Sequence, residues 1–206
     1  MDADQRIQLV GGGDLAIAIA KKDTVGFWLS AAQLEFGQFS AVNGVVSSFD
    51  DGELDSLYDK EVNVIKSDRG IVRYFGSKTT IIDKTDLLRQ ENIADLHIFM
   101  KNVFQALALK YQFKPNTQKT LWSPMYNEAR IILEDLAANS AIQPNEGEGW
   151  IWEGDQEARS TSQLKYNTPS DITQGIYKAR CRFQPVGAAE YIGITLERTS
   201  QSVNVQ

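Results

Sequence analysis

The sequence predicts an α/β domain of the α+β kind: a mixed β-sheet flanked by two long helices and followed by a strand-like C-terminal arm. Two periodicities support this prediction. Residues 93–111 and 121–138 repeat apolar side chains at every third or fourth position, the spacing of one helix face. Short runs rich in Val, Ile, Phe and Trp between turn residues predict strands instead. These runs are residues 62–65, 71–75 and 150–152, and a further strand-like run surrounds Cys181.

The composition is that of an ordinary soluble globular protein. The chain has 206 residues, of which 42% are hydrophobic and 23% charged, enough for one domain or for one domain with an appendage. A bilayer-spanning helix needs about 20 apolar residues. The longest apolar run, residues 15–20, is ended by Lys21 and Lys22, so we expect neither membrane insertion nor a signal peptide.

The net charge of −6 is unevenly placed. Residues 1–100 carry 16 acidic and 10 basic side chains, whereas residues 101–206 carry 11 of each. Direct nucleic-acid binding needs a basic footprint, so we expect none. The single cysteine, Cys181, can form neither an internal disulfide nor a zinc site, and a reducing place of synthesis fits it.

The first half of the chain alternates short elements with turns. Glycines 11–13 should break the chain before a helix over residues 15–22, which Asp14 can cap. The aromatic stretch 26–39 suggests loop and short strand. An acidic helix is predicted over residues 50–58, where carboxylates favour the helix N-terminus.

A β-hairpin should follow this helix. Residues 62–65 and 71–75 flank the turn 67–70, and Gly76 ends the second strand. Residues 79–82, two threonines and two isoleucines, suggest a third strand.

The second half contains the strongest helix prediction. Residues 93–111 are apolar nearly all round, so we expect this helix to be central, with Leu107 in the core. Pro115 should stop it before an amphipathic helix over residues 121–138. A polar loop, the aromatic run 150–152 and a further polar stretch come next.

The C-terminal tail has the period of a half-buried strand. Val203 and Val205 alternate with Asn204 and Gln206. A terminal strand can complete a sheet in its own chain or in a neighbour's, and strand addition at an open edge joins chains. We therefore expect a lead-in segment over residues 1–13, a domain over 14–196 and an arm over 197–206, and we assign the inter-subunit contact to Thr199, Val203 and Val205.

Three candidate chemical motifs have simpler structural explanations. His97 is the only histidine and has no neighbouring ligand in the sequence, so a partly buried helix histidine is expected. The glycines before Asp14 lack the pattern of a phosphate loop, which favours a hinge. Cys181 has no histidine nearby in sequence, which favours an inert strand cysteine.

Two acidic clusters are further candidate binding sites. The carboxylates at 50–55 do not match a calcium loop, so a solvated helix start is expected. The carboxylates around Trp150 and Trp152 resemble a sugar site, but packing of two tryptophans on one strand face explains them at least as well. These carboxylates are Glu146, Glu148, Glu153 and Asp155. We expect no catalytic residue, no metal ligand and no cofactor.

A series of short motifs runs in order along the chain from residue 13 to the end. The first is Lys22-Asp23 followed by Gly26-Phe27-Trp28. The hairpin supplies the second, around Asn63 and residues 70–79. The third is Tyr111-Gln112-Phe113-Lys114-Pro115-Asn116 followed by Leu121-Trp122. The closing set is Asn167, Asp171, Ile172, Gly175, Pro185, Ala189, Glu190, Tyr191 and Ile192.

This order resembles the C-terminal half of the contractile tail sheath family of bacteriophages and related particles. The first motif is similar to the family's Asp and Gly-hydrophobic-Trp element, and the third to its Phe-Glu-Pro-Asn and Leu-Trp signature. Two departures occur in the hairpin. Lys60 and Glu61 stand before Asn63 where glycine is common, and Tyr74-Phe75 replaces a tryptophan position. Family members usually also carry a further N-terminal portion.

The resemblance implies a structural protein of the tail. The family implies hexameric rings that stack helically around an inner tube, with terminal arms exchanged between subunits and contraction during delivery of DNA or effectors. The implied partners are further copies of the chain and the tube protein, with baseplate and tail terminator proteins as additional candidates. The implied place is the tail of a virion made in the host cytoplasm.

Two alternatives remain open beside a sheath subunit. One is a tail terminator, adaptor or sheath-initiating protein with a sheath-like domain. The other is a carbohydrate-active enzyme that uses the tryptophans and carboxylates of residues 146–155.

Within the sheath interpretation, the family's C-terminal domain lines the tube. Lys110, Lys114 and Lys119 surround the turn at Pro115 and Asn116, and they are predicted to form an exposed, tube-facing basic patch. A solvated connection between two helices is the alternative explanation of these lysines.

Overall fold

The computed structural model describes residues 12–40, 42, 44, 45, 48–144 and 149–189. The helices are α1 (Gly12–Val25), α2 (Leu34–Gly37), α3 (Asp51–Asp59), α4 (Glu91–Tyr111), α5 (Ser123–Ala138) and α6 (Pro169–Thr173). The strands are β1 (Val64–Asp68), β2 (Ile71–Phe75), β3 (Trp150–Glu153) and β4 (Arg180–Phe183). Short helical turns are η1 (Leu87–Arg89), η2 (Gln118–Trp122) and η4 (Thr161–Gln163).

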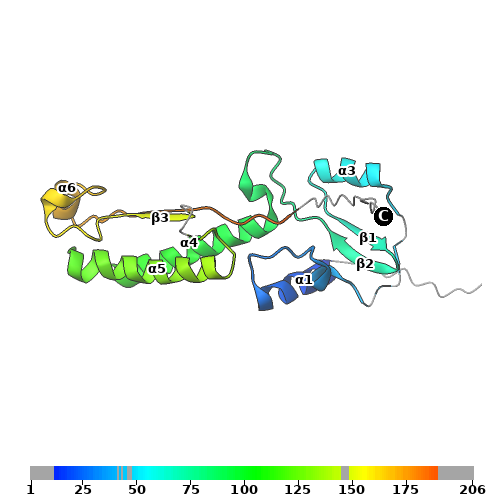
Figure 1. Ribbon diagram of the computed structural model, residues 1–206, viewed down its shortest axis with the longest axis horizontal. Helices are drawn as coiled ribbons and strands as arrows, with labels where there is room; N and C mark the ends of the chain where they lie inside the picture. The colour runs from blue at the N-terminus through cyan, green and yellow to red at the C-terminus, as the bar shows by residue number, and fades with distance from the viewer. Residues whose placement is uncertain (1–11, 41, 43, 46–47, 145–148, 190–206) are drawn as a thin grey trace, which may run out of the picture.

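These elements form an elongated molecule (Figure 1). The helices α1 and α3 and the strands β1 and β2 make up one part, which we call the proximal lobe (residues 12–90). The helices α4 and α5 lie side by side along the other part, the distal lobe (residues 91–185), with β3 over them and α6 at its far end. The α+β class predicted from the sequence is confirmed.

The proximal lobe is built on the predicted hairpin. β1 pairs antiparallel with β2 from Val64 opposite Phe75 to Asp68 opposite Ile71. The two turn residues, Arg69 and Gly70, have φ angles of 51° and 82°, the left-handed geometry that suits a two-residue hairpin turn. The hairpin packs on residues from α1, α2 and the following loop. That core consists of Ala31, Phe39, Val72 and Tyr74, with Leu15, Ile19 and Ile65 against it.

The acidic helix α3 begins with a capping box. The Asp50 side chain accepts from the Glu53 amide at 2.8 Å, and the Glu53 side chain accepts from the Asp50 amide at 3.1 Å. These bonds satisfy donors that a helix start leaves unpaired. The carboxylates of this run therefore serve the helix start, as expected, and among the described residues no group of three or more His, Cys, Asp and Glu side chains could hold a metal ion.

The distal lobe is held together by two connected cores. One lies between α4, α5 and β3 and contains Leu96, Met100, Leu133, Leu136, Ala141, Ile142 and Trp150. The second lies at the far end and contains Leu107, Tyr111, Leu121, Trp122, Ala129 and Ala158. The lobes meet where Phe27, after α1, stacks on Phe99 of α4 with ring centroids 4.2 Å apart.

The sheet differs from the prediction. In the described residues the strands form two separate antiparallel pairs, β1 with β2 and β3 with β4, in place of one mixed sheet. Only the β3–β4 pair packs on the two long helices. Residues 79–82 form no strand, because residues 78 and 90 make a single bridge and the chain between them is an exposed loop. Residues 26–39 contain α2 and one bridge residue, Gln38, where a short strand was expected.

Three further predictions need correction. Gly12 and Gly13 do not break the chain, since they are the first residues of α1, and Asp14 therefore lies within the first turn of that helix. The helix α4 is not buried all round, because Ile98 is 57% and Leu109 62% exposed. One face of α4 packs on α5 and β3, and the other is open in the single chain.

Candidate functional site

The two candidate chemical residues lie close together but form no reactive pair. His97 on α4 is exposed, contrary to the partly buried position expected, and it lines a shallow groove with Cys181 and Phe183 of β4. Burial raises the pKa of the Cys181 thiol to about 11, so this thiol stays protonated at neutral pH. The two residues are 84 positions apart in the sequence, so their proximity could not be predicted from it.

The tryptophans of β3 are packing residues. Trp150 is buried between α4 and α5. Trp152 lies between the rings of Phe104 and Tyr126, with centroids 5.9 and 6.4 Å away. Glu153 bonds to Arg180 at 3.3 Å and Arg182 at 2.8 Å across the strand pair. Both tryptophans thus pack against other rings or the core, and Glu153 is held in two ion pairs. Glu146 and Glu148 lie outside the described residues.

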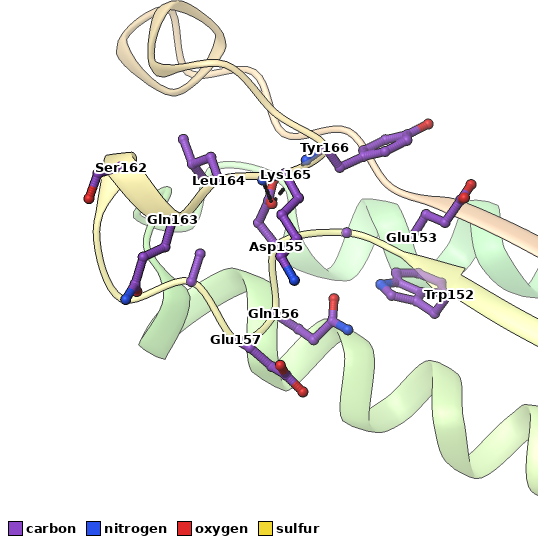
Figure 2. A pocket seen from close by; sticks show the side chains of 12 residues that line it. Trp152, Glu153, Asp155, Gln156, Glu157, Ser162, Gln163, Leu164, Lys165 and Tyr166 are labelled. Atoms are coloured by element: carbon purple, nitrogen blue, oxygen red, sulfur yellow. Dashed lines mark hydrogen bonds between the residues drawn. The ribbon is translucent and has the colours of Figure 1, made fainter.

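Asp155, directly after β3, is a structural acceptor. A pocket of about 720 Å³ adjoins it (Figure 2). The residue is 3% exposed, and its carboxylate accepts from the amides of Lys165 (2.6 Å), Tyr166 (3.1 Å) and Asn167 (2.7 Å) and from the Asn167 side chain (2.8 Å). Burial raises the pKa of Asp155, but these hydrogen bonds outweigh burial and hold the pKa below its usual range. An acid held ionised in this way is a poor proton donor.

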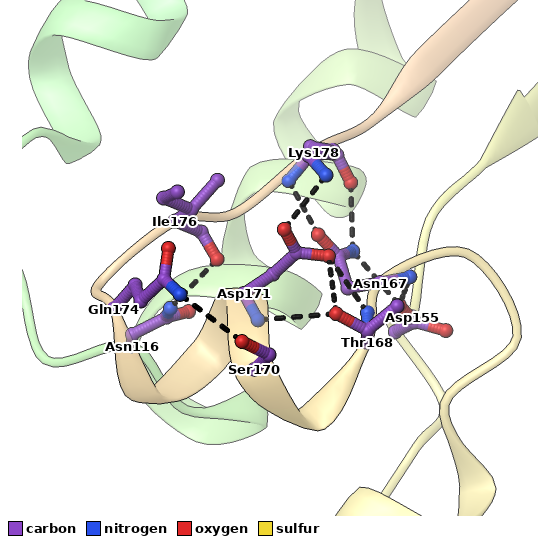
Figure 3. A network of polar contacts seen from close by, with 9 residues as sticks. All are labelled: Asn116, Asp155, Asn167, Thr168, Ser170, Asp171, Gln174, Ile176 and Lys178. Atoms are coloured by element: carbon purple, nitrogen blue, oxygen red, sulfur yellow. Dashed lines mark hydrogen bonds and ion pairs between the residues drawn. The ribbon is translucent and has the colours of Figure 1, made fainter.

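Asn167 extends this network to the segment before β4. Its side-chain amide donates to the Lys178 carbonyl at 2.8 Å, and its side-chain carbonyl accepts from the Lys178 amide at 2.7 Å (Figure 3). Asp171 forms a capping box with Thr168 at the start of α6 and an ion pair with Lys178 at 2.7 Å. The closing motif of the sequence therefore fixes the tip of the distal lobe.

The corner between α4 and α5 is fixed by the Pro-Asn and Leu-Trp motif. The indole of Trp122 donates to the Asn116 side chain at 2.8 Å, and Asn116 donates to the Ile176 carbonyl at 3.1 Å. The Trp122 ring also stacks on Tyr177, with centroids 6.0 Å apart and an interplanar angle of 4°. Two motifs that are distant in sequence are thus one structural unit, which joins the corner to α6.

The predicted basic patch is partly neutralised within the chain. Glu128 accepts from Lys110 at 2.7 Å and from the Tyr111 hydroxyl at 2.7 Å. Lys114 lies over the Tyr111 ring, 4.1 Å from its centroid. Lys119 is exposed and forms no ion pair in the described part of the chain. Lys114 and Lys119 therefore retain uncompensated charge at this corner.

Phe113 is the most exposed large apolar residue of the described chain, at 95%. Its φ of 65° lies in the left-handed region, which costs a bulky residue roughly 1–3 kcal/mol. Phe113 stands at the rim of an open, mainly apolar groove of about 730 Å³, which we call the corner groove. Leu109, Lys114, Leu121, Met125 and Tyr177 also line it. Sequence reasoning placed Phe113 in a motif but missed its exposure.

A buried lysine was also missed. Lys22 of α1 is fully buried and contacts Asp95 of α4, with Glu91 at 3.9 Å. Burial raises the pKa of Glu91, and the adjacent Lys22 ammonium opposes that rise. The signal was present in the sequence, because Ala18, Lys22 and Gly26 share one helix face at four-residue spacing, and all three are buried.

The carboxylates at the distal tip predict an acid-sensitive lobe. Hydrogen bonds from Lys178 and Thr168 lower the pKa of Asp171 to about 2. This value lies below the unfolded-state value of about 3.9, so the stabilisation is complete above pH 4 and is lost as the pH falls towards 2. We expect the unfolding temperature to drop over this interval, and to drop less for Asp171→Asn. Tryptophan fluorescence at a series of pH values measures this, and parallel curves for the two proteins would contradict it.

Solved structures share this fold. No protein-family model and no curated protein sequence matches the chain. The chain is similar to a chain of the anti-feeding prophage baseplate, 6-fold symmetrised, with a TM-score of 0.72 and 23% identity over 90% of this chain and 49% of that one. For the helical sheath of the same particle in its contracted state, the TM-score is 0.70 and the identity 24%, over 88% and 48% of the two chains.

A third match comes from the sheath complex of an extracellular contractile injection system, PVC, in its contracted state. Its TM-score is 0.64 and its identity 16%, over 92% of this chain and 50% of that one. The chain thus spans about half the length of the chains it matches. The fold is that of sheath and baseplate components of contractile injection systems, which confirms at this level the resemblance that the motifs indicated. Among the described residues, no helix is long and apolar enough to cross a membrane.

Proposed function

We propose that the chain is a structural subunit of a contractile tail sheath, which polymerises as hexameric rings around an inner tube and contracts during delivery. The observation that carries this proposal is the sheath fold over about nine-tenths of the chain. The interior of the distal lobe supports it, because Trp150, Trp152, Glu153 and Asp155 are engaged in packing and hydrogen bonds. The proposed place is the tail of a virion, assembled in the host cytoplasm.

A second candidate is a baseplate-proximal position, as a sheath initiator or adaptor. The match to a baseplate structure at a TM-score of 0.72 supports it beside the sheath match at 0.70. Both candidates share a structural role in which the chain contacts its own copies, the tube and neighbouring tail proteins. They differ in whether assembly stops at one ring.

We assign the joining of subunits to the C-terminal arm, residues 197–206, which follows the domain 14–196 and lies outside the described residues. In the described chain, β3 and β4 pair only with each other, so each strand has an edge that an added strand can occupy. The apolar groove beside β4 adjoins this edge and is lined by Leu87, Ile93 and Phe183. Thr199, Val203 and Val205 are the proposed contact residues.

Deleting residues 199–206 is expected to abolish ordered assembly and to leave the fold intact. Among residues 199–206 only Val203 and Val205 are apolar, so the unfolding transition should change little. Electron microscopy measures assembly, and circular dichroism during heating measures the fold. A control that replaces Val203 and Val205 by isoleucine keeps the apolar period and should still assemble. Ordered rings from the truncated chain would exclude the arm as the joining element.

The tube contact stays a prediction for Lys110, Lys114 and Lys119, and Lys110 is expected to contribute least because it pairs with Glu128. Exposed ion pairs are individually weak, about 0–1 kcal/mol, but they repeat around a ring and weaken with salt. We expect a triple change to Glu to reduce decoration of the tube at low ionic strength. Lys101→Glu, elsewhere on α4, is the control. Equal decoration by the triple variant and the unaltered protein would remove these lysines from the tube contact.

A further inference from the structure

Among the exposed apolar residues of the described chain, two groups stand out, and they lie in different lobes. The first is the corner groove, with Phe113 at its rim in the distal lobe. The second is the loop of residues 79–87 in the proximal lobe, where Ile82 is 82% and Leu87 60% exposed. We propose that the corner groove of one copy receives the 79–87 loop of a second copy.

The loop is held in a defined shape. The Thr85 amide and hydroxyl donate to Asp83 at 2.9 and 2.8 Å, and the Leu88 amide donates to Asp86 at 2.9 Å. Lys84 pairs with Asp59 at the end of α3 at 3.0 Å, which ties the loop to that helix. A loop already held in shape loses little freedom when it binds, so its exposed isoleucine is suited to insertion in a groove.

The charges of the two surfaces are opposite. Asp83 and Asp86 stand beside the exposed Ile82 and Leu87, and hydrogen bonds from Thr85 lower the pKa of Asp83, which keeps it ionised. The groove rim carries Lys114, and Lys119 follows it at the same corner. The Lys110 ammonium is already compensated by Glu128. An apolar groove with a basic rim suits a ligand whose apolar side chain is flanked by carboxylates. The 79–87 loop of this chain is such a segment.

The positions of the two surfaces make the contact a repeating one. The residues that line the corner groove come from the end of α4, the start of α5 and the turn after α6, and α6 lies at the far end of the distal lobe (Figure 1). The loop joins β2 to η1 in the proximal lobe. One copy therefore offers a groove to the copy before it and a loop to the copy after it. A head-to-tail contact of this kind generates rings or helices. The inference rests on the proposed function only for self-assembly. Leu87 also lines the groove proposed for the arm, so the tests below use Ile82, which does not line it. Lys114 and Lys119 are shared with the predicted tube contact.

Cross-linking tests which surfaces meet. In a Cys181→Ser background, Phe113→Cys protein is mixed with Ile82→Cys protein under assembling conditions and treated with a short bismaleimide. We expect mixed cross-linked dimers from this pair. The matched control replaces Phe113→Cys by Ile131→Cys, because Ile131 is 63% exposed on α5 and lies outside the groove. Equal yields from both mixtures would contradict the proposal.

Side-chain changes test the energetic role. Phe113→Ser and Ile82→Ser should each raise the concentration needed for assembly about tenfold or more, as expected for a central apolar contact. Phe113→Leu keeps an apolar side chain and should assemble at close to the concentration of the unaltered protein. Assembly of the serine variants at unaltered concentration would overturn the inference alone. A chain that stays monomeric at every concentration would overturn the proposed function as well. Loss of tube decoration by Phe113→Ser with intact self-assembly would assign the groove to the tube, against the inference.

Discussion

Replacing Asp155 by alanine is expected to destabilise the distal lobe by about 2–6 kcal/mol. The Asp155 carboxylate accepts four hydrogen bonds from residues 165–167, and these bonds close the loop 154–167. The exposed Lys165 and Tyr166 can turn their amides to water after the change. Asn167 is 4% exposed, so its backbone N–H and the side-chain N–H that faces Asp155 would stay buried without a partner, at about 1–3 kcal/mol each, while its other side-chain N–H keeps the Lys178 carbonyl.

The neighbouring Glu157→Ala is the matched control, because Glu157 is exposed and should change the free energy of unfolding by less than about 0.5 kcal/mol. Asp155→Asn should cost less than alanine, because its carbonyl oxygen can still accept from both Asn167 donors while its amide group faces the exposed Lys165 and Tyr166. Denaturant melts monitored by tryptophan fluorescence measure all three variants. A loss for Asp155→Ala as small as that for Glu157→Ala would mean that the network of Figure 3 does not hold the tip together.

Leu107→Ala is expected to cost roughly 2–5 kcal/mol through the cavity that it leaves. Leu107 is 6% exposed and lies in the second core of the distal lobe with Leu121 and Trp122. Leu109, two residues further on the same helix, is 62% exposed and supplies an unusually close control. Leu109→Ala should change the free energy of unfolding by less than about 0.5 kcal/mol. Similar losses for both variants would show that α4 faces the core differently from the structure described.

Local patterns in the sequence were sufficient to predict the type and position of most individual helices and strands. The helices α3, α4 and α5 were predicted within two residues of their observed bounds, because caps and three-to-four spacing act within one element. The hairpin was predicted too, but β1 begins two residues later and ends three residues later than expected, which leaves a shorter turn. The strand prediction for residues 79–82 was wrong, because β-branched residues favour a strand only where a partner strand exists. In the described part of the chain Ile82 has no partner strand, and its side chain is exposed.

The parts that could not be predicted depend on contacts between distant segments. Pairing of β3 with β4 brings Trp152 opposite Cys181, 29 positions away, and no local pattern selects that partner. The role of Asp155 depends on the course of the following loop, and the exposure of Phe113 depends on a left-handed backbone that sequence preferences would give to glycine. The motifs of the sheath resemblance nevertheless identified Asn116, Trp122, Asn167 and Asp171 before their hydrogen bonds were known.

Electron microscopy of the purified full chain, alone and with its tail tube, tests the central claim most directly. A sheath subunit should form rings or tubes with a regular repeat and should coat the tube along its length. A single ring at one end of the tube would instead favour the initiator or terminator position. Particles that remain monomeric at every concentration, and leave the tube bare, would contradict the assignment of this chain to a contractile sheath.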